Sequence, residues 1–332
     1  MKWFVTGATG FLGRHLVATL RERGDEVVAL CRKEDASLAA LGVDVRRGDV
    51  LDAASVRAAA TGCDGAYHVA GKVSRDIEDA PAMFEVHVEG TKVTLDALAE
   101  VGVDRVVYAS TSGTVAVSSD PDEVRDEHAP APTELVARWP YYRSKLYAEK
   151  AALERNREGF AVVVVNPSLL LGPGDLHGSS TEDVEKFLDR KIPFTPGGGI
   201  AFVDARDAAR ALLLAMEKGR AGERYLVNAA NMSLASFFGR LERMTDVKAP
   251  PMRLPRTSAT LAGVSADLMA RAAKLVGATP PVDRISAEMS QFFWYCSAAK
   301  AERELGFVAR DPNETLSDTV RDLRARGVVW PG

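Results

Sequence analysis

The chain has 332 residues, which is enough for one large α/β unit or two fused domains. Apolar residues make up 46% and charged residues 27%, ordinary values for a soluble globular protein. The net charge of -4 gives no electrostatic reason to expect nucleic acid or an anionic membrane as a partner.

The cysteines and histidines argue against a disulfide framework and a metal site. The three cysteines lie far apart and form no CxxC pair, so a reducing cytoplasm is the expected compartment. The five histidines show no HExxH spacing, so no metal is expected. Met1-Lys2 leads into a strand-like segment without a signal-peptide pattern, and no apolar stretch approaches membrane-spanning length.

Short apolar runs alternate with helical patterns through the first half of the chain. After the first run, Leu12, Leu16 and Leu20 recur every four residues, which predicts one face of a helix, and Gly24 supplies its C-terminal stop. The runs do not alternate with polar residues, which is typical of parallel strands buried on both faces. The predicted strands are residues 3–5, 27–30, 43–45, 66–69, 106–109 and 161–165. The predicted fold class is therefore α/β, a doubly wound parallel sheet.

The amino-acid composition of the sequence changes after Pro167. Residues 172–199 are rich in Gly, Pro, Ser and Asp, strand-like runs follow at 200–203 and 225–227, and residues 250–289 have a mostly helical pattern. We expect residues 1–166 to form one domain built on this sheet, to which the strands near 200–230 return. Residues 167–332 are expected to form mainly a smaller, mostly helical cap, which binds substrate at the carboxyl edge of the sheet.

A Gly-rich loop joins the first strand to the first helix. Gly7, Gly10 and Gly13 have GxxGxxG spacing, a variant of the dinucleotide fingerprint. We therefore expect residues 1–166 to be a Rossmann dinucleotide-binding domain. Gly7 permits the tight turn, Gly10 lets backbone approach a pyrophosphate, and Gly13 lets the helix pack closely, while the helix N-terminus offers free N–H groups to phosphate. The residues of this loop expected to contact the cofactor are Gly7, Thr9, Gly10, Phe11 and Leu12.

The end of the second strand bears on the choice of cofactor. An acid is usual there when the cofactor is NAD, but this position holds Cys31, followed by Arg32 and Lys33. Because Arg binds phosphate with a planar fork, NADP(H) is favoured and NAD(H) remains possible. Glu34 and Asp35 leave open the alternative that this is only a solvated loop.

Asp49 follows the third predicted strand and is placed to accept a hydrogen bond from the adenine amino group, with Val50 beside it. The alternative role for Asp49 is the N-cap of the next helix.

Three features predict the chemistry. A hydroxyl cluster at residues 110–114 follows a strand, and Tyr141 and Lys145 lie four residues apart, on one face of a helix. An ammonium beside a phenol lowers the phenol's pKa, so Tyr141 could exchange a proton near neutral pH. A serine hydroxyl could polarise a carbonyl oxygen. The alternative is a surface Tyr/Lys pair, which the order of the motifs disfavours.

Together, these motifs resemble the extended short-chain dehydrogenase/reductases over nearly the whole chain. The sequence most resembles the branch with dihydroflavonol 4-reductase, 3β-hydroxysteroid dehydrogenases and hopanoid-associated epimerase-like proteins. Segments 142–145, 166–168, 172–175 and 304–307 support that placement. The resemblance implies a Ser/Thr–Tyr–Lys triad, with Lys145 also holding the nicotinamide ribose, and a homodimer built on two helices per subunit, one of them containing Tyr141. It also implies further cofactor contacts by Val69, Ala70, Gly71 and the segment from Pro167 to Leu170.

The sequence departs from the family pattern at two positions. Leu169 stands where sugar-nucleotide enzymes usually carry Asn, which argues against a nucleotide sugar. His87 replaces another usual Asn and is expected to hydrogen-bond backbone instead. The triad hydroxyl aligns with Ser112 in epimerases and with Thr111 in dihydroflavonol reductase, and Ser112 is preferred.

The favoured function is an NADP(H)-dependent oxidoreductase that reduces a ketone or aldehyde of a mainly apolar metabolite, or oxidises the alcohol. The alternatives are an NAD-dependent sugar-nucleotide epimerase or dehydratase, and a non-catalytic NAD(P)-sensing protein. Such sensors tend to lose the Tyr/Lys pair, which this chain keeps.

Overall fold

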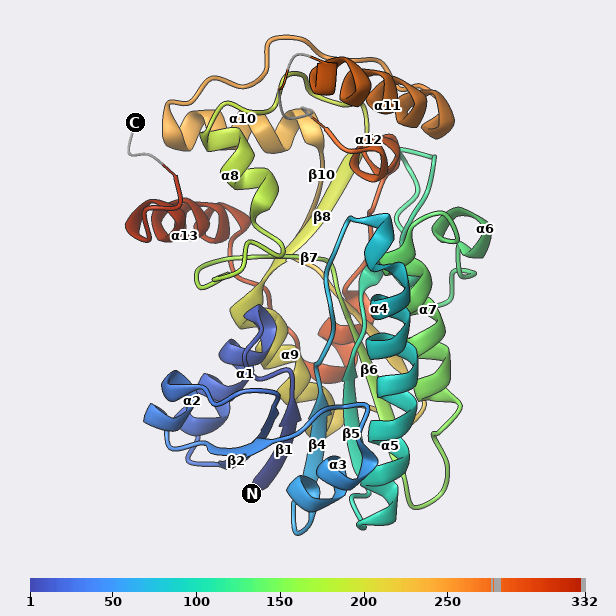
Figure 1. Cartoon of the computed structure of the whole chain (residues 1–332), viewed down its shortest axis with the longest axis vertical. Helices are drawn as coiled ribbons and strands as arrows, with labels where there is room; N and C mark the ends of the chain where they lie inside the picture. The colour runs from blue at the N-terminus through green and yellow to red at the C-terminus, as the bar shows by residue number, and fades with distance from the viewer. Residues whose placement is uncertain (276, 278–281, 330–332) are drawn as a thin grey trace.

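A seven-stranded sheet forms the lower half of the molecule (Figure 1). The computed structural model describes residues 1–275, 277 and 282–329. All neighbouring strands in this sheet are parallel, in the order β3-β2-β1-β4-β5-β6-β9. The strands are β1 (Lys2–Thr6), β2 (Glu26–Cys31), β3 (Asp44–Arg47), β4 (Gly65–His68), β5 (Arg105–Ala109), β6 (Ala161–Pro167) and β9 (Arg224–Val227). The predicted doubly wound α/β fold is confirmed, with strand ends shifted by at most two residues.

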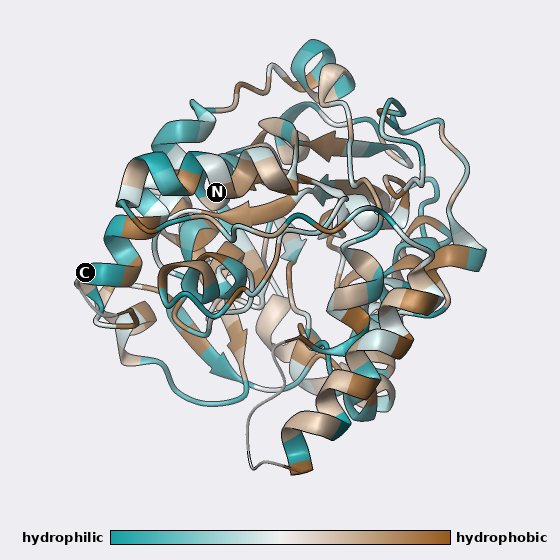
Figure 2. Ribbon diagram, turned by 90° about the horizontal axis from the view of Figure 1, so that it is seen from above, coloured by the Kyte–Doolittle hydropathy of each residue, from teal (hydrophilic) through white to brown (hydrophobic). Residues whose placement is uncertain are grey.

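Helices cover both faces of this sheet, as the uninterrupted apolar strands predict. One face packs against α1 and α9, and the other against α3, α5 and α7, giving two separate apolar cores. Figure 2 shows hydrophobic residues in the strands and along the helices, and many hydrophilic residues in the outer loops. The helices of this half are α1 (Phe11–Glu22), α2 (Ala36–Ala40), α3 (Ala53–Ala60), α4 (Ala80–Phe84), α5 (Gly90–Glu100), α6 (Thr133–Val136), α7 (Pro140–Leu153) and α9 (Ala205–Lys218).

The second half of the chain contains a sheet of its own. Strands β7 (Leu169–Leu171), β8 (Gly199–Asp204) and β10 (Ala230–Ser233) form a three-stranded mixed sheet in the order β10-β8-β7. The expectation that the strands near 200–230 return to the large sheet is therefore right for β9 and wrong for β8. β8 pairs instead with β7 and β10, whose short runs gave no strand signal in the sequence. The helices here are α8 (Glu182–Leu188), α10 (Leu234–Thr245), α11 (Ala259–Leu275), α12 (Arg284–Met289) and α13 (Pro312–Ala325).

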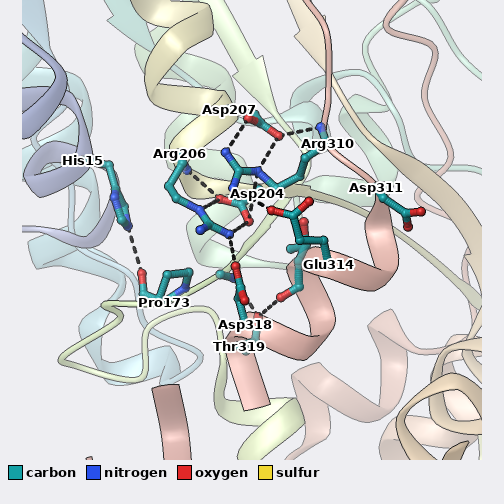
Figure 3. Close-up of polar contacts among 12 residues, drawn as sticks. His15, Pro173, Asp204, Arg206, Asp207, Arg310, Asp311, Glu314, Asp318 and Thr319 are labelled. Atoms are coloured by element: carbon teal, nitrogen blue, oxygen red, sulfur yellow. Dashed lines mark hydrogen bonds and ion pairs between the residues drawn. The ribbon is translucent and has the colours of Figure 1, made fainter. Parts of the chain in front are cut away.

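A buried ionic cluster lies where β8 leads into α9 (Figure 3). Asp204 is fully buried, caps α9 through the Arg206 backbone N–H at 2.9 Å, and pairs with the Arg206 guanidinium at 2.7 Å. Arg206 also pairs with Asp318 of α13 at 2.7 Å, and Arg310 pairs with Asp207 of α9 at 2.9 Å. The cluster thereby fastens α13 to the helix that packs on the large sheet.

In the part of the chain that the structure describes, no helix has the length and apolar character needed to cross a membrane.

Candidate active site

The Gly-rich loop has the geometry of a phosphate cradle. Gly7 has a φ of +73°, and a Cβ there would lie 2.6 Å from the Ala70 backbone nitrogen. At Gly13 a Cβ would lie 2.0 Å from the Gly7 carbonyl oxygen, so only glycine lets α1 start this close to the loop. Gly10 is the N-cap of α1, and no side chain caps the helix, so its first N–H groups face outward for an anion.

The loops after β1 and β4 meet at the point where the strand order reverses. β1 lies between β2 and β4 in the sheet, and a doubly wound sheet binds its ligand at such a switch point. The Ala70 N–H donates to the Thr6 hydroxyl at 3.3 Å, and Val69 and Ala70 are half-buried while Gly71 is exposed. The structure therefore brings the predicted contacts at Gly7 and Ala70 to one place.

Arg32 is exposed directly after β2, while the nearby Asp35 is already engaged. The Asp35 carboxylate accepts from the Ser37 and Leu38 N–H groups at 3.0 and 3.1 Å, as the N-cap of α2. It also pairs with Arg14 of α1 at 2.8 Å, and the Ser37 hydroxyl bond holds the pKa of Asp35 below its usual range. A carboxylate with these partners is poorly placed to accept from a ribose hydroxyl. The sequence analysis did not predict a role for Arg14, because nothing in the sequence around it indicated that its side chain pairs with Asp35.

Asp49 is half-buried after β3, and its alternative role is wrong. The N-cap of α3 is Asp52, whose carboxylate accepts from the Ala54 N–H at 3.0 Å. One oxygen of Asp49 accepts from the Leu51 N–H at 3.0 Å. The half-buried Val50 packs over Gly90 of α5, where a Cβ would lie 2.9 Å from the valine methyl.

Tyr141 and Lys145 lie in the first half of α7, with Tyr141 half-buried and Lys145 buried. The Lys145 ammonium donates to the Tyr108 hydroxyl at 3.0 Å and to the Ala109 carbonyl at 2.7 Å. Among the hydrogen bonds of the described residues, none joins the Tyr141 hydroxyl to Lys145. The expected lowering of the Tyr141 pKa is therefore wrong for this arrangement, because burial dominates and raises the pKa of Tyr141. Burial also lowers the pKa of Lys145 to about 8.

The hydroxyl cluster is held by a carboxylate that sequence reasoning missed. Glu149 is buried and accepts from the hydroxyls of Ser110 and Thr114, at 2.5 and 2.8 Å. It also accepts from the Asn166 amide at 2.7 Å and pairs with Arg224 at 3.1 Å. The available signal was its position four residues after Lys145, on the same face of α7.

With the hydroxyls of Ser110 and Thr114 bonded to Glu149, Ser112 and Thr111 are left as candidates for the predicted triad hydroxyl. Ser112 is buried beside the Cys296 thiol, while Thr111 is half-buried and accepts from the Gly113 N–H at 3.3 Å. Both lie directly after β5, so the preference for Ser112 stays a prediction.

His87 joins the loop after β4 to α7, which confirms the expected backbone hydrogen bond. Its Nε2 accepts from the Lys72 N–H at 3.0 Å, and its Nδ1 bonds the Ser144 hydroxyl at 2.8 Å. The His87 ring also lies edge-on to Tyr141, with centroids 5.6 Å apart. Desolvation lowers the pKa of His87 to about 2, so the ring is neutral.

The segment between Pro167 and Leu170 leads from the large sheet to the small one. Pro167 ends β6, and Ser168 bonds Asn228 at 2.9 Å. Leu169 and Leu170 are half-buried in β7, and Leu169 packs against the apolar core of the second half. The position where sugar-nucleotide enzymes carry Asn is thus apolar here.

The chain is similar to a known protein family, to known proteins and to a solved structure. The model of the NAD dependent epimerase/dehydratase family matches residues 3–228. The chain is 33% identical to "Putative dihydroflavonol 4-reductase" from Synechocystis sp., over 98% of this chain and 96% of that protein. It is 39% identical to cinnamoyl-CoA reductase 1 from Oryza sativa subsp. japonica, over 67% of this chain and 69% of that protein. Among solved structures it is similar to gox2253, with a TM-score of 0.85 and 28% identity over 99% of each chain.

Proposed function

The chain belongs to the NAD dependent epimerase/dehydratase family, and we propose that it reduces a ketone or aldehyde of a mainly apolar metabolite with NADP(H). The resemblance drawn from its motifs is confirmed, and the protein is an NAD(P)-dependent oxidoreductase of the extended short-chain dehydrogenase/reductase type. Its relatives include reductases whose names refer to a dihydroflavonol and a cinnamoyl thioester. Oxidation of the corresponding alcohol is the same reaction in reverse.

The observation that carries the NADP(H) preference is the contrast between Arg32 and Asp35. Arg32 is exposed at the carboxyl end of β2, where a 2′-phosphate needs a cation. Asp35 is neutralised by Arg14 and by the N–H groups of α2, so it offers little to an unphosphorylated ribose. These contacts support a guanidinium that recognises a phosphate.

The residues of α7 supply the proton for the proposed reduction. The bound dinucleotide supplies the hydride. Burial raises the pKa of Tyr141, so its hydroxyl stays protonated and gives its proton to the carbonyl oxygen as the alcohol forms. Ser112, or Thr111 in its place, donates a hydrogen bond to the same oxygen, and Lys145 holds the ribose. We propose that residues 167–332 provide most of the substrate contacts, with Leu169 favouring apolar groups.

Titration with NADPH and NADH tests the cofactor preference. NADPH should bind at least about tenfold more tightly, and Arg32→Ser should remove most of that difference, because each charged hydrogen bond contributes about 1.5–3 kcal/mol. Lys33→Ser is the matched control and should change the ratio less. Tighter binding of NADH by the wild type would contradict the proposal.

A screen of ketones, aldehydes and UDP-sugars by NADPH oxidation tests the substrate class. Tyr141→Phe should abolish turnover while it spares NADPH affinity, since only the proton-donating hydroxyl is removed. Conversion of a UDP-sugar with the cofactor retained would instead indicate an epimerase or dehydratase. Cofactor binding with no turnover of any carbonyl would indicate a sensor.

We also propose a cytoplasmic homodimer. The three cysteines are free and buried, as suits a reducing compartment. Phe84 of α4 and Tyr147 of α7 are 42% and 48% exposed, with ring centroids 6.4 Å apart. Exposed aromatic pairs are typical of interfaces, and this one lies on the helix that contains Tyr141. Light scattering measures the mass, and Tyr147→Glu should shift it to that of a monomer.

A further inference from the structure

A buried chain of polar side chains runs from Lys145 back to the Gly-rich loop. Lys145 donates to the Tyr108 hydroxyl at 3.0 Å, and the Thr91 hydroxyl of α5 lies beside Tyr108. The Thr91 hydroxyl lies 3.1 Å from His68 Nε2, and His68 Nδ1 lies 2.8 Å from the Thr6 hydroxyl. All five side chains belong to residues with 4% exposure or less. Polar side chains from five different elements thus lie in one buried line.

The chemistry of Lys145 fixes the direction of the hydrogen bond at one end of this line. An ammonium only donates, so the Tyr108 oxygen accepts from Lys145. Burial lowers the pKa of His68 to about 3, so its ring is neutral and donates from one nitrogen while it accepts at the other. The ring thereby links the Thr91 and Thr6 hydroxyls.

We propose that Tyr108 is a positioning residue for Lys145, oriented in that role by Thr91 and His68. This inference rests on the proposed function, because it concerns the lysine of the same site. Tyr108 contacts the ammonium from strand β5. The Lys145 Nζ also lies over the Tyr108 ring, 4.7 Å from its centroid, so the phenol provides both an acceptor and an aromatic face. Ala109 provides the second acceptor from the same strand.

The other charged and titratable groups around Lys145 act from three elements. Glu149, on α7, raises the Lys145 pKa, while burial lowers it more strongly. The charge of Lys145 in turn lowers the pKa values of His68 on β4 and of His87 in the π-helix Glu85–Glu89. Tyr141 lies one turn before Lys145 on α7. Because Tyr108 accepts directly from the ammonium, loss of its hydroxyl should disfavour the charged form of Lys145.

The test compares Tyr108→Phe with Tyr67→Phe. Tyr67 is an equally buried tyrosine on the neighbouring strand β4. Its side chain lies on the opposite face of the sheet, where it packs against Trp3. Tyr108→Phe should move the basic pKa in the pH profile of kcat/KM down by about one unit, the size expected for loss of one charged hydrogen bond. Tyr67→Phe should keep the wild-type profile. An unmoved profile in Tyr108→Phe, or an equal shift in both variants, would overturn the proposal.

A second readout does not depend on turnover. In protein labelled with ¹⁵N-lysine, the side-chain signal of Lys145, assigned with Lys145→Arg, gives its titration midpoint by NMR. The midpoint should fall in Tyr108→Phe and, by a smaller amount, in Thr91→Val, which removes the group that orients Tyr108. An unmoved midpoint in both variants refutes the positioning role. A shifted midpoint in a protein that reduces no carbonyl supports it while the proposed function fails.

Thr91→Val also covers the case in which Tyr108→Phe does not fold. It removes no ring and leaves the Lys145 acceptors in place, so a fall of its midpoint supports the same line of hydrogen bonds. A midpoint equal to that of the wild type contradicts it.

Discussion

Single glycines decide whether the dinucleotide loop can form. The backbone at Gly7 has a left-handed φ, which favours glycine. At Gly13 the Gly7 carbonyl oxygen lies too close to leave space for any side chain. The sequence analysis assigned Gly13 to close packing of the helix. The structure shows that its close contact is the Gly7 carbonyl oxygen, inside the loop itself.

Replacing Gly13 by Ala should therefore cost cofactor affinity and stability together. The new Cβ would lie 2.0 Å from a backbone oxygen, which cannot move away as a flexible side chain could. We expect a loss of at least about tenfold in NADPH affinity and of about 1–3 kcal/mol in the free energy of unfolding. Fluorescence titration and urea unfolding measure the two quantities.

Gly239→Ala is the control for that prediction. Its Cβ would meet only the Arg243 side chain, at 3.6 Å, within α10. Since Ala is the better helix former, stability should rise by up to about 1 kcal/mol and affinity should stay unchanged. Wild-type affinity in the Gly13 variant would contradict the assignment of the loop.

Helix α7 organises the site at the scale of elements. Tyr141, Lys145 and Glu149 follow one another at intervals of four residues, so one helix face carries the proposed proton donor, the ammonium and the carboxylate that holds the hydroxyl cluster. His87 fixes this helix to the loop after β4 through Ser144 and Lys72. The neutral His87 ring thus connects α7 to the loop after β4.

The buried His87 should make stability depend on acid pH. Its pKa of about 2 in the folded protein lies below the ordinary 6.5, so below pH 6.5 the unfolded chain binds a proton that the folded chain does not. Stability is therefore full above pH 6.5 and falls as the pH decreases from there, by about 1.4 kcal/mol per unit once the unfolded histidine is charged. His87→Asn should make this slope shallower, while His68 keeps a similar contribution.

Urea unfolding at pH 7, 6 and 5 measures the slope. Asn can keep a hydrogen bond to backbone and does not titrate. As the pH falls, the free energy of unfolding should therefore decrease less in the variant than in the wild type. Replacement of the exposed His177 by Asn is the control. Equal slopes in His87→Asn and the wild type would contradict a neutral buried ring.

At the scale of the whole molecule, the ionic cluster around Asp204 joins the two halves. Its carboxylates, Asp204 and Asp207, have side-chain exposures of 0% and 2%, and their cations come from two separate stretches of the chain. A buried carboxylate that loses its cation keeps the cost of desolvation without the attraction that offset it.

Arg310→Met should therefore destabilise the protein by about 3 kcal/mol, because Met keeps the aliphatic stem but leaves Asp207 without its guanidinium. Arg46→Met breaks an ion pair whose side chains are 58% and 44% exposed, and should cost far less, because water screens this pair. Urea unfolding compares the two variants, and similar losses in both would show that the cluster is not the joint between the halves.

The sequence by itself determined the features that short stretches encode. Uninterrupted apolar runs predicted strands buried on both faces, Gly7 and Gly13 predicted the loop, and a four-residue spacing put Tyr141 and Lys145 on one helix face. These features depend on backbone conformation and periodicity within a few residues, so no distant partner is needed to predict them.

Only the tertiary structure decided which partners these residues have. Lys145 binds Tyr108, which lies 37 positions earlier, and Asp35 binds Arg14, which lies 21 positions earlier. Asp52 rather than Asp49 caps α3, and residues 200–203 joined the small sheet rather than the large one. Each outcome depends on packing between separate elements, where several partners of the right chemistry compete and only their placement in space selects one.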